Sequence, residues 1–263
     1  MNRGGETRKI FNELIRFLGG KKTSEKSPGQ LAIEIAEFFL GAPYVAGTLE
    51  TQRTERLIVN LQEFDCVTFA ETVVTLTCLV RSGKRSFKAF ERLLQKIRYR
   101  QGRLQGYSSR LHYFSDWIHD NQKKGIVRNV TEEIGGRPLT KAIAFMTTNP
   151  DLYPPLRNEM NLRGMRSVER SMSRRSFYYI PKEALRPRED RIRDGDLIAI
   201  TTHADGLDVK HVGFAKRVNR RIHLLHASAK EGEVILSRQT LYRYLIQNRI
   251  HSGIMVARIQ AKP

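Results

Sequence analysis

Residues 64–83 read FDCVTFAETVVTLTCLVRSG, and this stretch predicts one amphipathic helix that begins at its cysteine. Apolar and small side chains recur at spacings of three, four and seven, which is typical of a single buried face. These positions are Phe64, Val67, Ala70, Val73, Val74, Thr77 and Val80. Asp65 is the candidate N-cap, and Arg81 followed by Gly83 is the candidate end. Cys66 therefore lies in the first turn of the expected helix.

A cysteine in a first helical turn is expected to be reactive. Unpaired backbone N–H groups and the helix dipole favour the thiolate there. Much later in the chain, residues 211–214 read HVGF and predict a strand that begins with an imidazole. His226 ends the next expected strand, so a hairpin about 218–220 would make His211 and His226 neighbours. A thiol beside an imidazole can form a nucleophile–base pair.

The rest of the pattern predicts helices first and strands later. Helical segments are expected at 10–18, 31–40, 87–97, from 111–118 onward and at 241–247, with a helical turn at 139–146. Short apolar runs predict strands at 126–134, 177–180, 197–201, 212–217, 222–226, 234–237 and 254–259. Long loops are expected at 41–60 and 149–175. This order without βαβ alternation indicates an α+β fold with an antiparallel sheet.

The composition supports one large domain with a real core, because 40% of the 263 residues are apolar. We expect a single domain over 1–263, with a helical part at about 8–148, a loop or insertion at about 149–175 and a sheet part at about 176–260. No window reaches the roughly 20 apolar residues of a membrane span. Residues 1–9 are polar and lack the apolar region of a secretory signal, so the protein is expected to be cytoplasmic or to have lost such a signal.

The net charge of +19 comes from 46 Lys plus Arg against 27 Asp plus Glu. Such a balance predicts attraction to anionic partners, which include nucleic acid, an anionic envelope polymer and a membrane surface. The basic residues are spread over the whole chain, and no helix-turn-helix, zinc finger or RNA-binding sheet signature occurs. Nucleic-acid binding is therefore kept as the alternative class of function.

The two cysteines cannot pair with each other while the expected helix exists. Cys66 and Cys78 lie twelve residues apart, which corresponds to about 18 Å along a helix, whereas disulfide Cα atoms lie within ~7 Å. Cys78 has no polar neighbours in its pattern and is expected in the core. Ligand spacings typical of structural zinc do not occur, so neither a metal nor a cofactor is expected.

Four short motifs, in this order, resemble the NlpC-type, papain-like cell-wall cysteine hydrolases. They are Gly41-Ala42-Pro43-Tyr44, Asp65-Cys66, His211-Val212-Gly213 and His226-Ala227-Ser228. Three longer stretches, 64–71, 111–117 and 206–213, resemble more narrowly the N-acetylmuramoyl-L-alanine amidase-like branch of that superfamily. The resemblance covers about residues 30 to 260 and implies a papain-like fold, in which the helical part carries the nucleophile and the antiparallel sheet carries the histidines. One departure is Val67-Thr68, where the superfamily usually has a small residue or Ser-Gly.

The resemblance implies that Cys66 is the nucleophile, His211 the general base and acid, and His226 the group that orients His211. The substrate-binding residues that it implies are Tyr44, Asp65, Arg110, His112 and Tyr113. The backbone N–H of Cys66 becomes a candidate oxyanion donor. The expected substrate is peptidoglycan or a muropeptide, which implies a periplasmic or envelope location. The amidase branch implies cleavage between N-acetylmuramic acid and L-alanine, whereas the commoner superfamily specificity implies the γ-D-glutamyl to diamino-acid bond.

Each of these residues also has a purely structural interpretation. Cys66 could be a core cysteine, Tyr44 a loop-packing residue, and His211 or His226 a strand histidine, with Ser228 or another polar group orienting the base. His119, His203, His223 and His251 are expected to have surface or capping roles. The densest basic run is either a solvated loop or a contact for an anionic polymer, and it comprises Arg157, Arg163, Arg166, Arg170, Arg174 and Arg175. A wall-binding relative without activity is a third possibility, which the intact thiol and imidazoles argue against.

Overall fold

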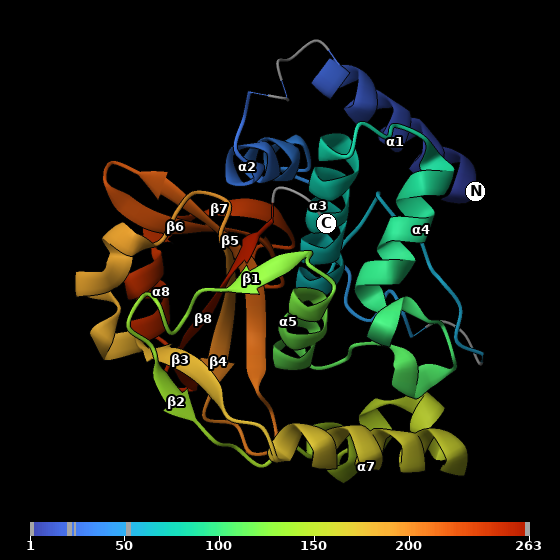
Figure 1. The fold of residues 1–263 in the computed structure, drawn as a ribbon, viewed down its shortest axis with the longest axis vertical. Helices are drawn as coiled ribbons and strands as arrows, with labels where there is room; N and C mark the ends of the chain where they lie inside the picture. Colours follow the sequence, from blue (N-terminus) through green and yellow to red (C-terminus); the bar gives the residue numbers. More distant parts are fainter. Residues whose placement is uncertain (1–2, 20–22, 24, 51–53, 261–263) are drawn as a thin grey trace.

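Figure 1 shows a sheet with the N-terminal helices on one face and α8 on the other. The computed structural model describes residues 3–19, 23, 25–50 and 54–260. The helices are α1 (Arg3–Gly19), α2 (Pro28–Phe38), α3 (Cys66–Arg81), α4 (Phe87–Arg98), α5 (Phe114–Lys123), α6 (Phe145–Thr148), α7 (Glu159–Ser173) and α8 (Leu241–Ile246). The 3-10 turns are η1 (Arg100–Gly102), η2 (Tyr107–Ser109), η3 (Pro150–Leu152), η4 (Pro154–Arg157), η5 (Lys182–Ala184) and η6 (Arg186–Arg191). The strands are β1 (Val127–Asn129), β2 (Arg137–Leu139), β3 (Phe177–Pro181), β4 (Leu197–Thr202), β5 (Val209–Val218), β6 (Arg221–Ser228), β7 (Glu233–Thr240) and β8 (His251–Ile259).

Eight strands of the described residues form one sheet in the order β2-β3-β8-β4-β5-β6-β7, and β1 pairs with β8. All of these strand pairs are antiparallel. β4 is buried along its whole length because both faces of the sheet are covered. The predicted combination of helices and an antiparallel sheet is therefore confirmed.

Alternation along the central strands supplies two cores. Val212 and Phe214 of β5 join the large core that the helices α1 to α5 build on one face. Ala215 of the same strand faces the second core, which contains Leu241 and Leu245 of α8. A third, smaller cluster packs α6 and α7 against the segment around Tyr107. These three clusters hold the helices in position against the sheet and against one another.

Two local predictions near the candidate site are confirmed. Asp65 is the N-cap of α3, which starts at Cys66. The strands β5 and β6 form a hairpin in which Val218 pairs with Arg221. Its two turn residues, Asn219 and Arg220, have φ of 47° and 66°, as a two-residue hairpin turn of type I′ requires.

Three predicted segments are wrong in whole or in part. The expected loop at 149–175 contains the helix α7, because Asn158 caps a helix whose buried face carries Met165, Glu169 and Met172. At 139–146, a strand ends at Leu139 and the helix begins only at Phe145. The expected strand at 126–134 is reduced to three residues. The Asn129 side chain accepts hydrogen bonds from Thr131 and turns the chain there.

Candidate active site

A cleft of about 330 Å³ opens at the N-terminus of α3. Its walls come from the loop after α2, the start of α3, the segment before α5, the α6 region and the loop before β5. The lining residues are Tyr44, Ala46, Gly47, Leu49, Glu50, Asp65, Cys66, Val67, Glu71, Arg110, Leu111, His112, Tyr113, Met146, Tyr153 and Leu207. The cleft thus brings together Cys66 and all five side chains that the sequence predicts to bind substrate.

A capping box fixes the start of α3 and with it the position of Cys66. The Thr68 N–H donates to Asp65 Oδ1 at 2.7 Å, and the Asp65 N–H donates to Thr68 Oγ1 at 2.9 Å. Two otherwise unpaired backbone donors are satisfied in this reciprocal way. The departure from the superfamily pattern after the cysteine therefore has a structural role, since Thr68 completes the cap.

The Cys66 sulfur lies among backbone N–H groups. Burial of the sulfur, followed by the charge of Asp65, raises the pKa of the thiol to about 12, although nearby backbone amides, that of Val212 foremost, act to lower it. The expectation of a resting thiolate is not met, because removal of water from the sulfur outweighs the helix N-terminus. The contact with Val212 places the thiol beside the residue that follows His211.

His211 and His226 meet across the β5–β6 hairpin. His211 Nε2 lies 2.6 Å from His226 Nδ1, and the two rings are nearly perpendicular. Burial lowers the pKa of His211 to about 3, helped by His226, His251 and Lys210, and burial lowers the pKa of His226 to about 4. Both imidazoles are therefore neutral at pH 7, and they share a single N–H···N hydrogen bond.

Gly213 makes room for this histidine pair. A Cβ atom at Gly213 would lie 2.8 Å from the Cβ of His226, which is too close for two carbon atoms. The absence of a side chain therefore lets His226 lie across β5 toward His211.

An aromatic cluster surrounds the pair on the α8 side of the sheet. The Tyr244 ring stacks with His211 at a centroid distance of 6.3 Å and with His251 at 5.7 Å. It also meets the edge of His226 at 5.7 Å. His226 Nε2 and His251 Nδ1 are buried without a hydrogen-bond partner among the described residues. Sequence reasoning missed Tyr244 and expected a surface or capping role for His251, because no local pattern links α8 or the start of β8 to His211.

Tyr44 is held beside the thiol by backbone contacts. It forms a bridge with Phe64, in which Val45 donates to the Phe64 carbonyl and Phe64 donates to the Pro43 carbonyl, both at 2.9 Å. Burial and the charges of Cys66 and Asp65 raise the pKa of the Tyr44 hydroxyl. The hydroxyl therefore stays protonated and can donate a hydrogen bond.

Arg110 and His112 form the polar wall opposite Cys66. Arg110 Nη2 pairs with Glu50 Oε1 at 2.5 Å, and the guanidinium lies over the ring of Tyr107. His112 Nε2 donates to the Tyr107 carbonyl at 2.9 Å. Burial, followed by the charge of Arg110, lowers the pKa of His112 well below its usual range. The imidazole is therefore neutral, with Nδ1 left as an acceptor.

Tyr113 connects the cleft to α7. Its hydroxyl donates to Glu169 Oε1 at 2.6 Å and accepts a hydrogen bond from the Met146 N–H at 2.9 Å. Glu169 also accepts from the backbone N–H and the hydroxyl of Thr147. Glu169 is 3% exposed, so one buried carboxylate joins α7, α6 and the wall of the cleft.

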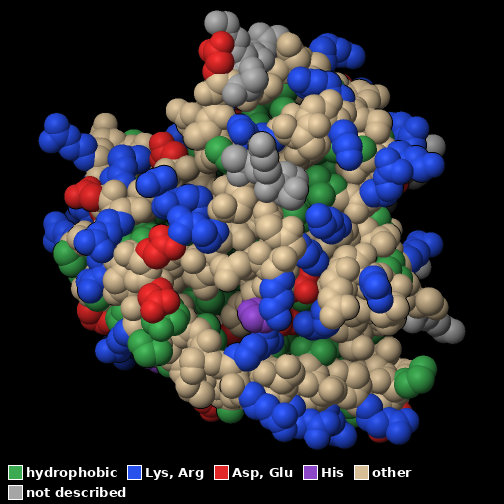
Figure 2. Space-filling model, in the orientation of Figure 1, with side chains coloured by type: hydrophobic (Ala, Val, Ile, Leu, Met, Phe, Trp, Pro, Cys, Tyr) green, Lys and Arg blue, Asp and Glu red, His purple; other side chains and the backbone are tan. Residues whose placement is uncertain are grey.

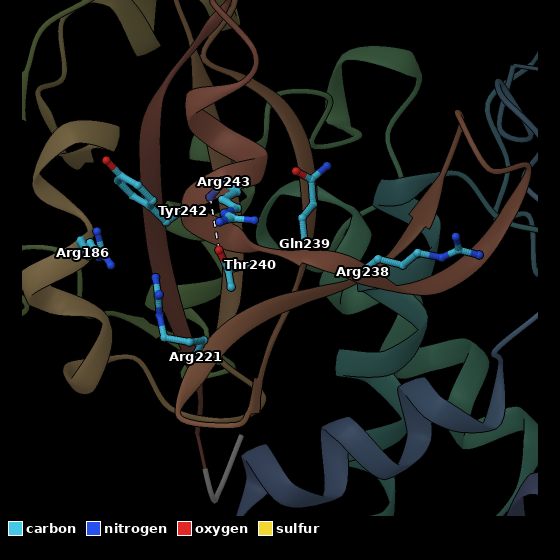
Figure 3. A pocket seen from close by; sticks show the side chains of 7 residues that line it. All are labelled: Arg186, Arg221, Arg238, Gln239, Thr240, Tyr242 and Arg243. Atoms are coloured by element: carbon cyan, nitrogen blue, oxygen red, sulfur yellow. Dashed lines mark hydrogen bonds between the residues drawn. The ribbon is translucent and has the colours of Figure 1, made fainter.

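A second cavity of about 300 Å³ lies at α8 and shares no residue with the cleft. Figure 3 shows Arg186, Arg221 and Arg243 around Thr240, whereas Arg238 points away from them. Arg221 pairs with Glu189 at 2.7 Å, and Arg186 lies over the ring of Tyr242. We assign no function to this cavity.

Residues 3–19, 23, 25–50 and 54–260 contain no group of three or more His, Cys, Asp or Glu side chains that could hold a metal ion. Over the same ranges, every helix is too short or too polar to cross a membrane. Both cysteines are free, and Cys78 is buried as predicted.

The fold defines a class of α+β proteins in which a cysteine at a helix N-terminus lines a cleft, and an antiparallel sheet carries paired histidines that do not line this cleft. The chain belongs to the N-acetylmuramoyl-L-alanine amidase-like family, whose model matches residues 34–254. This confirms the narrower resemblance, which the three longer stretches indicate.

Several solved structures are similar to this chain, and one of them carries the name of the same activity. An N-acetylmuramoyl-L-alanine amidase from Bacteroides uniformis is 37% identical, with a TM-score of 0.84 over 89% of this chain and 99% of that one. A Bacteroides fragilis protein provisionally named a xylanase is 39% identical, with a TM-score of 0.80 over 85% and 99%. A Legionella pneumophila protein at 21% identity shares the fold, with a TM-score of 0.72 over 98% and 96%. Among the curated proteins, no sequence matches this chain.

Proposed function

We propose that the protein is a papain-like cysteine amidase that cleaves the bond between N-acetylmuramic acid and L-alanine in peptidoglycan or muropeptides. One observation carries this proposal. The Cys66 sulfur lies at the amide of Val212, directly after His211, and His211 is hydrogen-bonded to His226 at 2.6 Å. The family and the Bacteroides uniformis amidase support the substrate class.

The proposed reaction begins from a neutral thiol and a neutral imidazole. His211 donates its Nε2–H to His226 Nδ1, which leaves His211 Nδ1 free to accept the thiol proton. As the sulfur attacks the amide carbonyl, the proton moves to His211, and His211 then protonates the leaving amine of L-alanine. Water hydrolyses the resulting thioester with His211 acting as base, and Cys66 regains its proton.

Two groups are placed to stabilise the tetrahedral intermediate. The backbone N–H of Cys66 belongs to the unpaired donors of a helix N-terminus. The Tyr44 hydroxyl stays protonated beside the thiol, as its raised pKa indicates. Both can donate to an oxyanion that forms next to the sulfur.

The opposite wall supplies groups for the rest of the substrate. His112 Nδ1 can accept a hydrogen bond from a substrate N–H or O–H, and the buried Arg110 guanidinium is paired with Glu50 and Glu55. We assign substrate binding to Arg110, His112 and Tyr113. Asp65 acts mainly through the cap of α3, because its carboxylate is bonded to Thr68.

One neighbour is named a xylanase, which raises glycosidase chemistry as an alternative. The carboxylates of the cleft do not favour it. Glycoside hydrolysis needs two carboxyl groups free to act as acid and as nucleophile or base. Here Asp65 caps α3, Glu50 pairs with Arg110, and Glu71 pairs with Arg98 at 2.6 Å. Each carboxylate is already held by a hydrogen bond or an ion pair.

Muropeptide digestion tests the proposal. The wild type and Cys66→Ala are incubated with purified disaccharide-peptides, and the products are identified by mass spectrometry. We expect sugar-free stem peptides from the wild type and none from Cys66→Ala. Products that retain Ala-Glu on the sugar would instead establish the γ-D-glutamyl endopeptidase. Absence of any product, together with salt-sensitive binding to DNA, would favour the nucleic-acid alternative.

Location follows from the proposed substrate. Peptidoglycan lies outside the cytoplasmic membrane, so the proposed activity places the protein in the periplasm or envelope. Fractionation of cells with an antibody to the protein tests this assignment.

A further inference from the structure

A polar groove of about 520 Å³ runs between α7 and the segment that contains η1 and η2. Its walls carry four serine hydroxyls, two glutamine amides and two guanidinium groups. Val168 is the one large apolar side chain among its lining residues. A lining of this kind offers mixed donors and acceptors along its length and little hydrophobic surface.

The groove depends on a close approach of two elements. A Cβ atom at Gly164 of α7 would lie 2.7 Å from the Ser108 hydroxyl oxygen. Glycine in a helix interior costs stability, but here it lets α7 pack directly against η2. Ser167 and Ser171 follow one turn apart on the same side of α7, facing Ser108 and Ser109.

One end of the groove carries positive charge. Arg100 and Arg175 both pair with Asp116 at 2.6 Å, and Asp116 is 2% exposed. Two guanidinium groups on one carboxylate leave a net positive charge. Arg100 Nη2 is buried and has no hydrogen-bond partner among the described residues. Both guanidinium groups line the groove, so a ligand that carries a carboxylate or carbonyl oxygen can pair with them there.

The outer side of α7 extends the positive charge. Arg163, Arg166, Arg170 and Arg174 are exposed and recur every three or four residues, so they lie on one helical face. Figure 2 shows Lys and Arg side chains along the lower edge of the molecule, where Figure 1 places α7. This face attracts anionic polymers toward the groove.

The groove and the catalytic cleft share a wall. Ser109 lines the groove, and the next residue, Arg110, lines the cleft. On the other side, Glu169 of α7 is bonded to Tyr113 of the cleft. The two sites are therefore neighbours across one layer of residues.

We propose that this groove is a saccharide-binding site that holds a carboxylate-bearing glycan next to the cleft. Hydroxyl and amide side chains match the hydroxyl and acetamido groups of a sugar chain, and Arg100 matches a carboxylate. A nucleic acid fits less well, because no aromatic side chain lines the groove for base stacking. The identity of the glycan as the wall glycan rests on the proposed function.

The test uses a probe that the proposed activity cannot cleave. Peptide-free oligosaccharides of alternating N-acetylglucosamine and N-acetylmuramic acid are titrated into the full-length wild type by calorimetry. Ser171→Trp fills the groove and should weaken binding about tenfold, roughly 1.4 kcal/mol. The matched control is Asn12→Trp, which introduces the same side chain at an exposed position of α1 and should leave the affinity unchanged.

Three outcomes overturn the proposal. The first is that the wild type does not bind the glycan, and the second is that Ser171→Trp binds it equally well. The third is that single-stranded DNA binds more tightly than the glycan and loses affinity in Ser171→Trp. A Tm of Ser171→Trp equal to that of Asn12→Trp separates filling of the groove from misfolding. If the protein bound the glycan but cleaved no muropeptide, the proposed amidase activity would be refuted and the proposed saccharide site would stand. Intact sacculi and soluble disaccharides, compared in the same assay, distinguish a polymer from a fragment as the natural ligand.

Discussion

The histidine pair shows how individual residues control the proposed chemistry. His211 Nε2 and His226 Nδ1 share one hydrogen bond, and the proposed mechanism requires that His211 donates it, which leaves His211 Nδ1 available. Gly213 provides the space for this contact. The motif order in the sequence predicts both histidines. The role of the glycine could not be predicted from the sequence, because it depends on the distance between two atoms on different strands.

Substitution of His226 tests this orienting role. His226→Ala should lower kcat about 100-fold, within the range for loss of acid–base assistance. His226→Gln keeps an acceptor and should lose about tenfold. Steady-state kinetics on a soluble disaccharide-peptide measure both values. Equal loss in the two variants would contradict a role that depends on the acceptor.

The same histidines make stability depend on pH. The pKa values of His211 and His226 in the folded protein, about 3 and about 4, lie below the unfolded value of 6.5. Between these values the unfolded chain binds more protons than the folded one, so stability is fully present above about pH 6.5 and falls as the pH decreases. We expect the Tm to drop steadily from pH 7 to pH 4. His226→Gln should show a shallower decrease, and an identical slope would count against the buried neutral pair.

At the scale of elements, α3 was predictable and α7 was not. The start of α3 has a local signal in Asp65 and Thr68, together with an apolar face of helical period. The buried face of α7 is interrupted by Glu169, and its arginines resemble a solvated loop. The partners of Glu169 lie in distant segments, so its burial could not be inferred from the neighbouring sequence.

The capping box of α3 gives a prediction about stability and activity together. Thr68→Ala removes one half of the box and should cost about 1 kcal/mol, or roughly 2–4 °C in Tm. It should also reduce turnover, because the first turn carries Cys66. Ser86→Ala at the N-cap of α4 is the matched control. Calorimetry should show a similar Tm loss in both variants, with unchanged turnover only in Ser86→Ala.

The helix α8 is expected to position His211 through Tyr244. Tyr244→Ala removes the ring that stacks between His211 and His251, and kcat should fall about tenfold with little change in KM. Tyr244→Phe keeps the ring and should restore kcat. Tyr242→Ala on the same helix controls for general loosening of α8. A rise in KM alone would assign Tyr244 to substrate binding instead.

At the scale of the whole molecule, the net charge of +19 governs the first encounter with an anionic polymer. Exposed charges are screened by salt, with a Debye length of about 10 Å at 0.1 M and 3 Å at 1 M. Binding to intact sacculi should therefore weaken steeply as sodium chloride is raised in a pelleting assay. Cleavage of a soluble disaccharide-peptide should change much less. If salt reduced binding and cleavage equally, the positive charge would act inside the cleft and not in the first encounter.

The contacts of the Glu169 carboxylate affect how the protein would act on a long, surface-bound substrate. It fastens α7, which borders the groove, to Tyr113, which lines the cleft. Because this hydrogen bond is buried, we expect a displacement of α7 to move Tyr113 as well. A glycan strand that binds along α7 would therefore change the width of the neighbouring cleft. The protein would then respond to the length of its substrate as well as to the bond that it cuts.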